Sequence, residues 1–300
     1  MSRKKVYTLM LIATWFWSGA FIAGKYCAPY IPPFTLVFLR FLIASAVLWP
    51  ALKLFPIEEK YRLKKSDMRF LVNTSVIGMF GYHVLFFASL HYTTAINASI
   101  IAAVNPVLTA VFCAVLLKQF VNKQMLGGIL LSLAGVLMTI TGMNLDVVAS
   151  LSFNRGDIFM IAAVALWCLY ITVSRKRTMP PIHFTFYNFV ITAILTFPLA
   201  LSENPLSWML GAGAAAWLAV AYMAVCPSVF SYCVMQVGIK ELGSQRTAVF
   251  YNFVPAFSML LAVLILGEAF ELIKVITMLF IVAGVVICQT AGERMEKSRK

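Results

Sequence analysis

Aromatic and uncharged polar side chains recur at helical spacing inside the hydrophobic stretches of this chain. Ser228, Tyr232 and Gln236 follow one another at intervals of four residues and therefore share one face of a helix. Amides, hydroxyls and indoles at such positions hydrogen-bond a polar ligand, while ring faces pack on its apolar or cationic part. We expect the following side chains to line a binding pocket of low net charge: Trp15, Trp17, Ser18, Tyr82, Asn97, Asn105, Trp167, Tyr170, Tyr232, Gln236, Tyr251 and Asn252.

Each of these side chains also has a purely structural interpretation. Asparagine, glutamine, serine and tyrosine bridge packed helices in membranes without binding anything. Tryptophans near the ends of spans form an interfacial belt, where we expect Trp208 and Trp217. For any single residue, the sequence leaves both roles open.

Arg40 is the one charged residue clearly inside a hydrophobic stretch. It lies about six residues, or roughly 9 Å, from one end of its stretch, against a bilayer half-thickness of ~15 Å. Because an unpaired arginine at a helix centre costs ~2.5–3.5 kcal/mol on insertion, Arg40 should face protein or water. It either holds a substrate carboxylate, as part of the binding site, or caps carbonyls and sets the helix tilt.

Composition identifies the elements that position these residues as membrane-spanning helices. Hydrophobic residues make up 62% of the 300 residues and charged residues 12%, and the mean hydropathy is +0.90. A spanning helix needs ~20 apolar residues, and the connections between the apolar runs are short. We therefore predict an all-α polytopic membrane protein with ten spans, at about 7–26, 34–52, 69–89, 95–117, 124–142, 158–174, 184–202, 212–236, 247–267 and 272–291.

The net charge of +13 follows the orientation of these spans. With the N-terminus in the cytoplasm, every lysine and arginine except Lys25, Arg40, Arg155 and Lys274 lies on the cytoplasmic side. A nucleic-acid surface would instead need a basic patch interleaved with exposed aromatic residues. We expect a multi-pass protein of a bacterial inner (cell) membrane, with both termini in the cytoplasm.

The chain also repeats itself. The segment 106–119 recurs as 255–268, and Ala134-Gly135-Val136 recurs as Ala283-Gly284-Val285. Each copy contributes five spans, and five is odd, so the second copy enters the membrane from the opposite side. The predicted organisation is two inverted five-helix repeats, residues 1–148 and 149–300, which is the architecture of alternating access.

Two prolines occupy corresponding positions in this repeat, Pro106 in the fourth span and Pro255 in the ninth. A proline inside a helix removes one backbone hydrogen bond and kinks the helix. In lipid, the freed carbonyl must find a protein or water partner. We expect both prolines to act as hinges next to the binding site, with a simple packing kink as the alternative.

Several motifs follow one another over about residues 5–290. They are Trp15-Phe16-Trp17-Ser18-Gly19, Lys25, Pro33 with Arg40-Phe41, Asn105-Pro106, Leu266-Gly267-Glu268 and the two Ala-Gly-Val triplets. This order resembles the EamA-type ten-helix members of the drug/metabolite transporter superfamily. The resemblance implies a small-metabolite transporter, often an exporter of amino acids or related compounds. One departure is Gln119, which stands where an acidic residue often closes the fourth span.

The sequence predicts a transporter of small polar or amphipathic metabolites that works by alternating access around a central aromatic and polar cavity. No Asp or Glu lies in the middle of a span, so we expect facilitated transport, or coupling through a group other than a midplane carboxylate. The alternatives are a flippase for a lipid-linked or amphipathic substrate, a proton-coupled drug/metabolite antiporter and a channel.

An enzyme is not expected, because the sequence offers no catalytic carboxylate pair, Ser/His arrangement or metal cluster. The histidines His83, His91 and His183 have no neighbours at ligand spacing, and the cysteines form no C-x-x-C pair. We therefore expect no metal and no other cofactor. The expected partners are a small-molecule substrate and the lipid bilayer, without nucleic acid, for a monomer or a homodimer.

Overall fold

The computed structural model describes residues 3–54, 61, 63–116, 122–141, 154–174, 177, 179–204, 211–242, 247 and 250–298, and among them the regular elements are all helices. Its elements are α1 (Arg3–Cys27), α2 (Pro33–Leu54), α3 (Lys65–Thr74), η1 (Ser75–Gly81), α4 (Tyr82–Tyr92), α5 (Ala95–Ala102), α6 (Asn105–Leu116), α7 (Lys123–Thr141), α9 (Arg155–Ser174), α10 (Pro181–Ser202), α12 (Ala214–Met223), η2 (Ala224–Phe230), α13 (Ser231–Leu242), η3 (Phe250–Phe253), α15 (Val254–Leu261), η4 (Ala262–Leu266) and α16 (Leu272–Ser298).

These elements join into the predicted spans. The third span is α3–η1–α4, the fourth α5–α6, the eighth α12–η2–α13 and the ninth η3–α15–η4, while each other span is one helix. Among the described residues, seven spans are long and apolar enough to cross a membrane, and Val254–Leu266 and Leu272–Ile287 are shorter apolar helices. Together with α7, they confirm the prediction of an all-α, ten-span fold.

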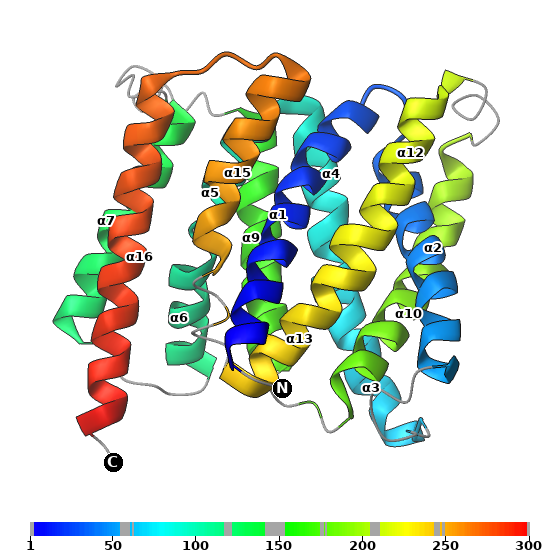
Figure 1. The fold of residues 1–300 in the computed structure, drawn as a ribbon, viewed down its shortest axis with the longest axis horizontal. Helices are drawn as coiled ribbons and strands as arrows, with labels where there is room; N and C mark the ends of the chain where they lie inside the picture. The colour runs from blue at the N-terminus through cyan, green and yellow to red at the C-terminus, as the bar shows by residue number, and fades with distance from the viewer. Residues whose placement is uncertain are drawn as a thin grey trace.

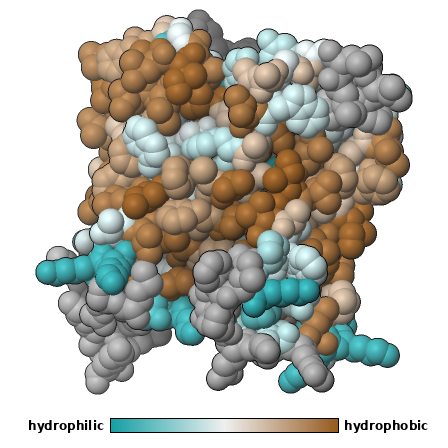
Figure 2. All heavy atoms as spheres, turned by 45° about the vertical axis from the view of Figure 1, so that its right-hand side comes forward, coloured by the Kyte–Doolittle hydropathy of each residue, from teal (hydrophilic) through white to brown (hydrophobic). Residues whose placement is uncertain are grey.

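The two ends of the bundle differ in polarity. The start of α1 and the end of α16 lie at the same end (Figure 1), called the terminal side below, and the opposite end is the far side. Figure 2 shows a face that is hydrophobic over most of its height, with strongly hydrophilic side chains gathered toward the terminal side. Leu218 and Leu264 are 70% and 72% exposed, as expected of side chains that face lipid. On this face, the strongly hydrophilic side chains therefore lie on the side of the two termini.

The fourth and ninth spans are each interrupted just before their shared proline. In the fourth span, a turn at 103–104 separates α5 from α6, and Pro106 is the second residue of α6. In the ninth span, the 3-10 helix η3 precedes α15, and Pro255 is the second residue of α15. A proline at a helix start loses an N–H that has no helical partner there. The two prolines therefore stand at the start of α-helical segments, at the positions where the sequence predicted kinks, and their role as hinges stays a prediction.

The third and eighth spans each contain a π-helix at corresponding repeat positions, which the sequence did not predict. In η2, Pro227 has no N–H to give to the carbonyl of Met223, and the hydroxyl of Ser228 donates to that oxygen instead, at 2.9 Å. In η1, Gly78 leaves room for the ring of Tyr170. π-helical turns gather at functional sites, and both of these border the pocket described below.

The fifth and tenth spans, α7 and α16, pack against each other at one edge of the bundle (Figure 1). Gly284 lies directly against the backbone of Gly128 and against Ser132. The Ser132 hydroxyl also donates to the Ile281 carbonyl at 3.0 Å. Small residues let the two backbones approach closely, so α7 and α16 form a tightly packed pair.

Candidate functional site

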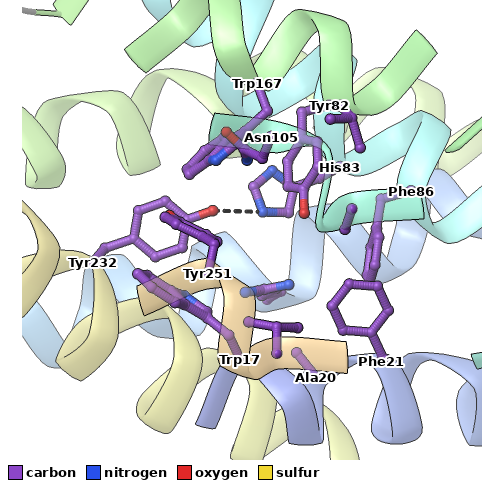
Figure 3. A pocket seen from close by; sticks show the side chains of 14 residues that line it. Trp17, Ala20, Phe21, Tyr82, His83, Phe86, Asn105, Trp167, Tyr232 and Tyr251 are labelled. Atoms are coloured by element: carbon purple, nitrogen blue, oxygen red, sulfur yellow. Dashed lines mark hydrogen bonds between the residues drawn. The ribbon is translucent and has the colours of Figure 1, made fainter. Parts of the chain in front are cut away.

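A central pocket lies where spans one, two, three, four, six, eight and nine meet (Figure 3). Its volume is about 40 Å³, far below the ~300–1,000 Å³ typical of pockets that hold small molecules. Side chains therefore fill most of the space between the lining residues. The lining residues are Trp17, Ala20, Phe21, Arg40, Tyr82, His83, Phe86, Ala102, Asn105, Val164, Trp167, Tyr232, Tyr251 and Val254.

The aromatic lining pairs across the two repeats. Trp17 corresponds to Trp167, and Tyr82 corresponds to Tyr232. The centroid of the Trp167 ring lies 4.9 Å from that of Tyr82 and 5.6 Å from that of Tyr232. Trp17 meets Tyr232 edge-on at 6.2 Å. The four rings form one cluster, so the pocket sits at the interface of the repeats, where carriers of this architecture bind their substrates.

Other wall positions break the symmetry. Tyr251 stacks on Trp17, with centroids 4.8 Å apart and planes 11° from parallel, and its hydroxyl donates to the sulfur of Met235 at 3.0 Å. The residue that corresponds to Tyr251 in the first repeat is Ala102. One half of the molecule thus presents a large ring where the other presents a methyl group.

Arg40 is buried in the pocket wall, with 2% of its surface exposed. Its Nε donates to the Ser228 hydroxyl at 2.7 Å, and its guanidinium carbon lies 5.7 Å from the Phe41 ring centre and 5.8 Å from that of Phe87. Within the described part of the chain, no acidic side chain pairs with it. A buried cation without a counter-ion is costly, so the pocket favours an anionic group.

The corresponding position in the second repeat is Asn188, and its amide is hydrogen-bonded to neighbouring helices and to its own helix. Its oxygen accepts hydrogen bonds from the hydroxyls of Thr74 and Ser75, each at 3.0 Å, and its nitrogen donates to the Phe184 carbonyl at 2.7 Å. Asn188 therefore joins α10 to the third span and adds no charge. Among the described lining residues, Arg40 is the lysine or arginine that gives this near-symmetric pocket a charged side.

His83 also lines the pocket, a position that the sequence did not predict. Its Nδ1 lies 2.8 Å from the Met79 carbonyl, and because a carbonyl only accepts, Nδ1 carries a proton. Its Nε2 lies 2.9 Å from the Tyr232 hydroxyl (dashed in Figure 3). A lone histidine in an apolar run gives no spacing signal. A comparison of the two repeats could have drawn attention to His83, because they differ at this position and the second repeat has Cys233.

The predicted place of Trp15 in the pocket is wrong. Trp15 is 41% exposed on the outer surface of α1, where it packs edge-on against Phe257 at 5.2 Å. The pocket face of α1 is formed by Trp17, Ala20 and Phe21, which are spaced for one side of a helix. Residue 15 is two positions from residue 17 and therefore points to the other side.

Several other predicted residues lie next to the pocket or away from it. Ser18 is buried and joins helices, since its hydroxyl donates to the carbonyls of Thr14 and Val254 at 2.9 and 3.2 Å. Tyr170 lies behind the wall, stacked on Trp167 at 5.1 Å. Gln236 is buried one turn beyond Tyr232.

Asn97 lies in the first turn of α5 at the far side, outside the pocket lining. The side chain of Asn252 lies outside the described residues. The predicted residues that meet around the pocket are Trp17, Arg40, Tyr82, Asn105, Trp167, Tyr232 and Tyr251. Their role in binding substrate stays a prediction.

Two carboxylates of the second repeat close the far side against the first. Glu268 accepts hydrogen bonds from the backbone N–H groups of Ala95 and Ile96 at 2.8 and 3.2 Å, at the start of α5. Glu203 does the same at the start of α2, where it accepts from the N–H of Thr35 at 2.8 Å. Carboxylates are stabilised at helix N-termini, because the N–H groups there have no helical partner.

A lysine adds to this closure. Lys25, at the end of α1, donates to the carbonyls of Leu90 and Thr93 at 2.8 Å each. Leu90 lies in the last turn of α4 and Thr93 directly follows the helix, where carbonyls lack helical partners. The far side therefore joins first-repeat helices to one another as well as to the second repeat.

A pocket at the interface of two related five-helix halves is the arrangement of an alternating-access carrier. The model of the EamA-like transporter family matches the chain twice, over residues 4–141 and 154–289. This chain belongs to the EamA-like transporter family. The two matches cover the two repeats, fall within the predicted halves 1–148 and 149–300, and identify an integral membrane transporter.

Relatives of this EamA-family transporter carry transporter names as well. The uncharacterised transporter YyaM of Bacillus subtilis (strain 168) is 30% identical over 95% of this chain and 93% of its own length. The aromatic amino acid exporter YddG of Ancylobacter novellus is 24% identical over 88% of this chain and 89% of its own length. A solved crystal structure shares the fold, with a TM-score of 0.66 and 23% identity over 96% of this chain and 98% of the other.

Proposed function

We propose that this EamA-family transporter exports amino acids or related carboxylates, and that the substrate carboxylate pairs with Arg40. The observation that carries the proposal is a buried arginine, without an acidic partner in the described chain, in the wall of an aromatic pocket. A carboxylate can accept two parallel hydrogen bonds from a guanidinium. The rings of Trp17, Trp167 and Tyr82 then offer faces for an apolar or aromatic side chain.

The chemistry of the pocket narrows the substrate class. Arg40 is the one lysine or arginine among the described lining residues, whereas a phosphorylated metabolite calls for a cluster of such groups. One relative is named an aromatic amino acid exporter, and the ring cluster here suits cargo of that kind. Asn105 and the tyrosine hydroxyls supply neutral hydrogen-bonding groups for the ammonium end.

The orientation follows from charge. Lysines and arginines gather on the terminal side, so we place that side and both termini in the cytoplasm of a bacterial inner membrane. The far side then faces outward, and Glu268, Glu203 and Lys25 hold it closed in this state. Substrate enters from the cytoplasm in this proposal, as an exporter requires. A monomer carries a complete pocket, and a homodimer is compatible with it.

Competition between two nearly identical ligands tests the carboxylate pairing. We expect L-phenylalanine to compete for transport of radiolabelled L-phenylalanine in proteoliposomes, and L-phenylalanine amide to compete at least about tenfold less well, since it lacks the charge that Arg40 would bind. Equal competition by the amide would contradict the proposal. If L-phenylalanine is not carried, thermal-shift screening of amino acids, amines and organic acids identifies the probe for the same comparison.

Variants of Arg40 test the residue itself. Arg40→Gln removes the cation and is expected to abolish transport, while Arg40→Lys keeps a charge without the planar fork and is expected to reduce transport strongly. Both are compared with the wild-type protein at matched membrane levels. Wild-type transport by both variants would rule out a role for Arg40 in holding the substrate.

A further inference from the structure

The hydrogen bonds of His83 fix which of its nitrogens can change its protonation. Nδ1 faces the Met79 carbonyl at 2.8 Å and keeps its proton, since the alternative would set two lone pairs against each other. In the neutral ring, Nε2 is therefore bare, and it accepts the hydrogen of the Tyr232 hydroxyl across 2.9 Å. Nε2 is the atom of this buried residue that is able to take up a proton.

The Tyr232 hydroxyl has a single hydrogen to donate, and Tyr232 and Arg40 line the same small pocket. With no anion in the pocket, that hydrogen goes to His83. A carboxylate on Arg40 is a stronger acceptor than a neutral imidazole and draws the same hydrogen toward itself. The hydroxyl oxygen then faces Nε2 with a lone pair, and this contact is a hydrogen bond only if Nε2 carries a proton.

The charge of Arg40 also links protonation of His83 to substrate binding. Arg40 and His83 contact the same two rings, since the Phe41 centroid lies 5.7 Å from the Arg40 guanidinium carbon and 4.7 Å from the His83 centroid, and Phe87 lies 5.8 and 6.5 Å from them. Two positive charges this close in a buried site repel each other. A bound carboxylate neutralises Arg40 and removes most of that repulsion.

The other groups that face His83 do not titrate near neutral pH. Tyr82 on its own helix and Tyr232 on α13 are phenols, α9 contributes Trp167, and α2 contributes Arg40 with Phe41. Among the described residues, no carboxylate contacts the ring. Histidine is the side chain whose charge changes most readily around physiological pH, so His83 is the group in this pocket suited to carry a proton.

We propose that His83 is a proton-binding site linked to the substrate through the Tyr232 hydroxyl, so that one proton binds and moves with each substrate carboxylate. The proposal rests on the proposed function, because the carboxylate on Arg40 is what drives proton uptake. It makes the carrier a proton–substrate co-transporter in which the coupling group is an imidazole, and in the proposed export direction the outward gradient of the substrate carries the proton out with it. The proton joins Nε2 when the carboxylate binds and leaves when the carboxylate leaves.

Calorimetry on the wild-type protein counts the proton directly. L-Phenylalanine is titrated into the purified transporter at neutral pH in two buffers of different ionisation enthalpy, and the difference in measured heat gives the protons bound per ligand. We expect about one proton, because neutral His83 becomes protonated when the substrate binds. Binding with no proton uptake would overturn the coupling and leave the proposed function standing. No binding of any amino acid or organic acid would overturn both.

Flux measurements on variants locate the proton. With the membrane potential clamped at zero, one coupled proton should drive about tenfold accumulation per unit of pH gradient, and His83→Asn should abolish accumulation while exchange at equal pH continues at a reduced rate. Tyr232→Phe should lower the proton count in the same way, because it removes the shared hydrogen. His91→Gln is the matched control, since His91 lies exposed near the end of α4, outside the pocket. Undiminished accumulation by His83→Asn would contradict the proposal.

Discussion

The carboxylate of Glu268 accepts a hydrogen bond of 2.8 Å from the backbone N–H of Ala95, so the end of the ninth span closes the start of the fourth. The two residues belong to different repeats, and a movement that opens the far side must break this contact. Glu203 makes the equivalent contact between the seventh span and the second. The closed far side thus depends on second-repeat carboxylates held at first-repeat helix ends.

Replacing Glu268 should open the far side more often. Glu268→Gln keeps an acceptor oxygen but loses the charge that strengthens its two hydrogen bonds, and bonds to charged groups contribute about 1.5–3 kcal/mol each. We expect faster labelling of an Ala20→Cys reporter in the pocket by a membrane-impermeant maleimide added from the far side. Labelling of the protein without the reporter cysteine measures the background.

Glu271→Gln is the matched control for this experiment. Glu271 directly precedes α16 and forms an ion pair with Lys274 in the first turn of that helix at 3.0 Å, and ion pairs of exposed carboxylates contribute little. It should leave the labelling rate unchanged. Equal acceleration by both variants would mean that the effect comes from lost surface charge, not from the contact with α5.

Gly78 should resist even a single added methyl group. A Cβ at this position would overlap the ring of Tyr170, and overpacking of a close-packed interior costs typically ~1–3 kcal/mol. We expect Gly78→Ala to lower the thermal unfolding temperature in detergent and to slow transport, since Tyr170 stacks on the pocket residue Trp167. Gly127→Ala, where no atom lies within 4 Å of the new Cβ, should be neutral or slightly stabilising. A stable, fully active Gly78→Ala protein would contradict this packing.

Ser228 should act on substrate affinity through Arg40. Ser228→Ala removes the hydroxyl that accepts from Arg40 Nε at 2.7 Å, so the guanidinium loses its anchor to η2. We expect KM to rise by about tenfold, in line with the ~1.5–3 kcal/mol of a charged hydrogen bond. Ser45 lies on α2, the helix of Arg40, and its hydroxyl donates to the Phe41 carbonyl one turn earlier. Ser45→Ala removes only that bond and should leave KM unchanged. A similar change in both variants would argue against a specific role for Ser228.

Much of the fold could be predicted from the sequence, because membrane spans and internal repeats produce patterns that extend over many residues. The paired rings Trp17 and Trp167 were predicted from the repeat, and they meet in one cluster with Tyr82 and Tyr232. The π-helices were not predictable from a single position, because η2 contains a proline and the corresponding η1 does not. Arg40 was found because a charge in an apolar run is conspicuous, whereas a lone histidine such as His83 is not.

Trp15 was predicted to line the pocket but lies outside it, and the contrast with Trp17 provides a test of the pocket. The sequence offered two tryptophans two residues apart, and only helix packing decides which one faces inward. Trp17 is 7% exposed and stacks on Tyr251, while Trp15 is 41% exposed on the opposite side of α1.

Trp17→Ala should therefore reduce transport at least about tenfold, by opening the wall and removing a stacking face that contributes about 0.5–1.5 kcal/mol beyond its buried area. Trp15→Ala removes a side chain of equal size from the same helix and should keep near-wild-type transport at matched membrane levels. Loss of transport in Trp15→Ala with retention in Trp17→Ala would reverse the assignment of the helix face and contradict the pocket described here.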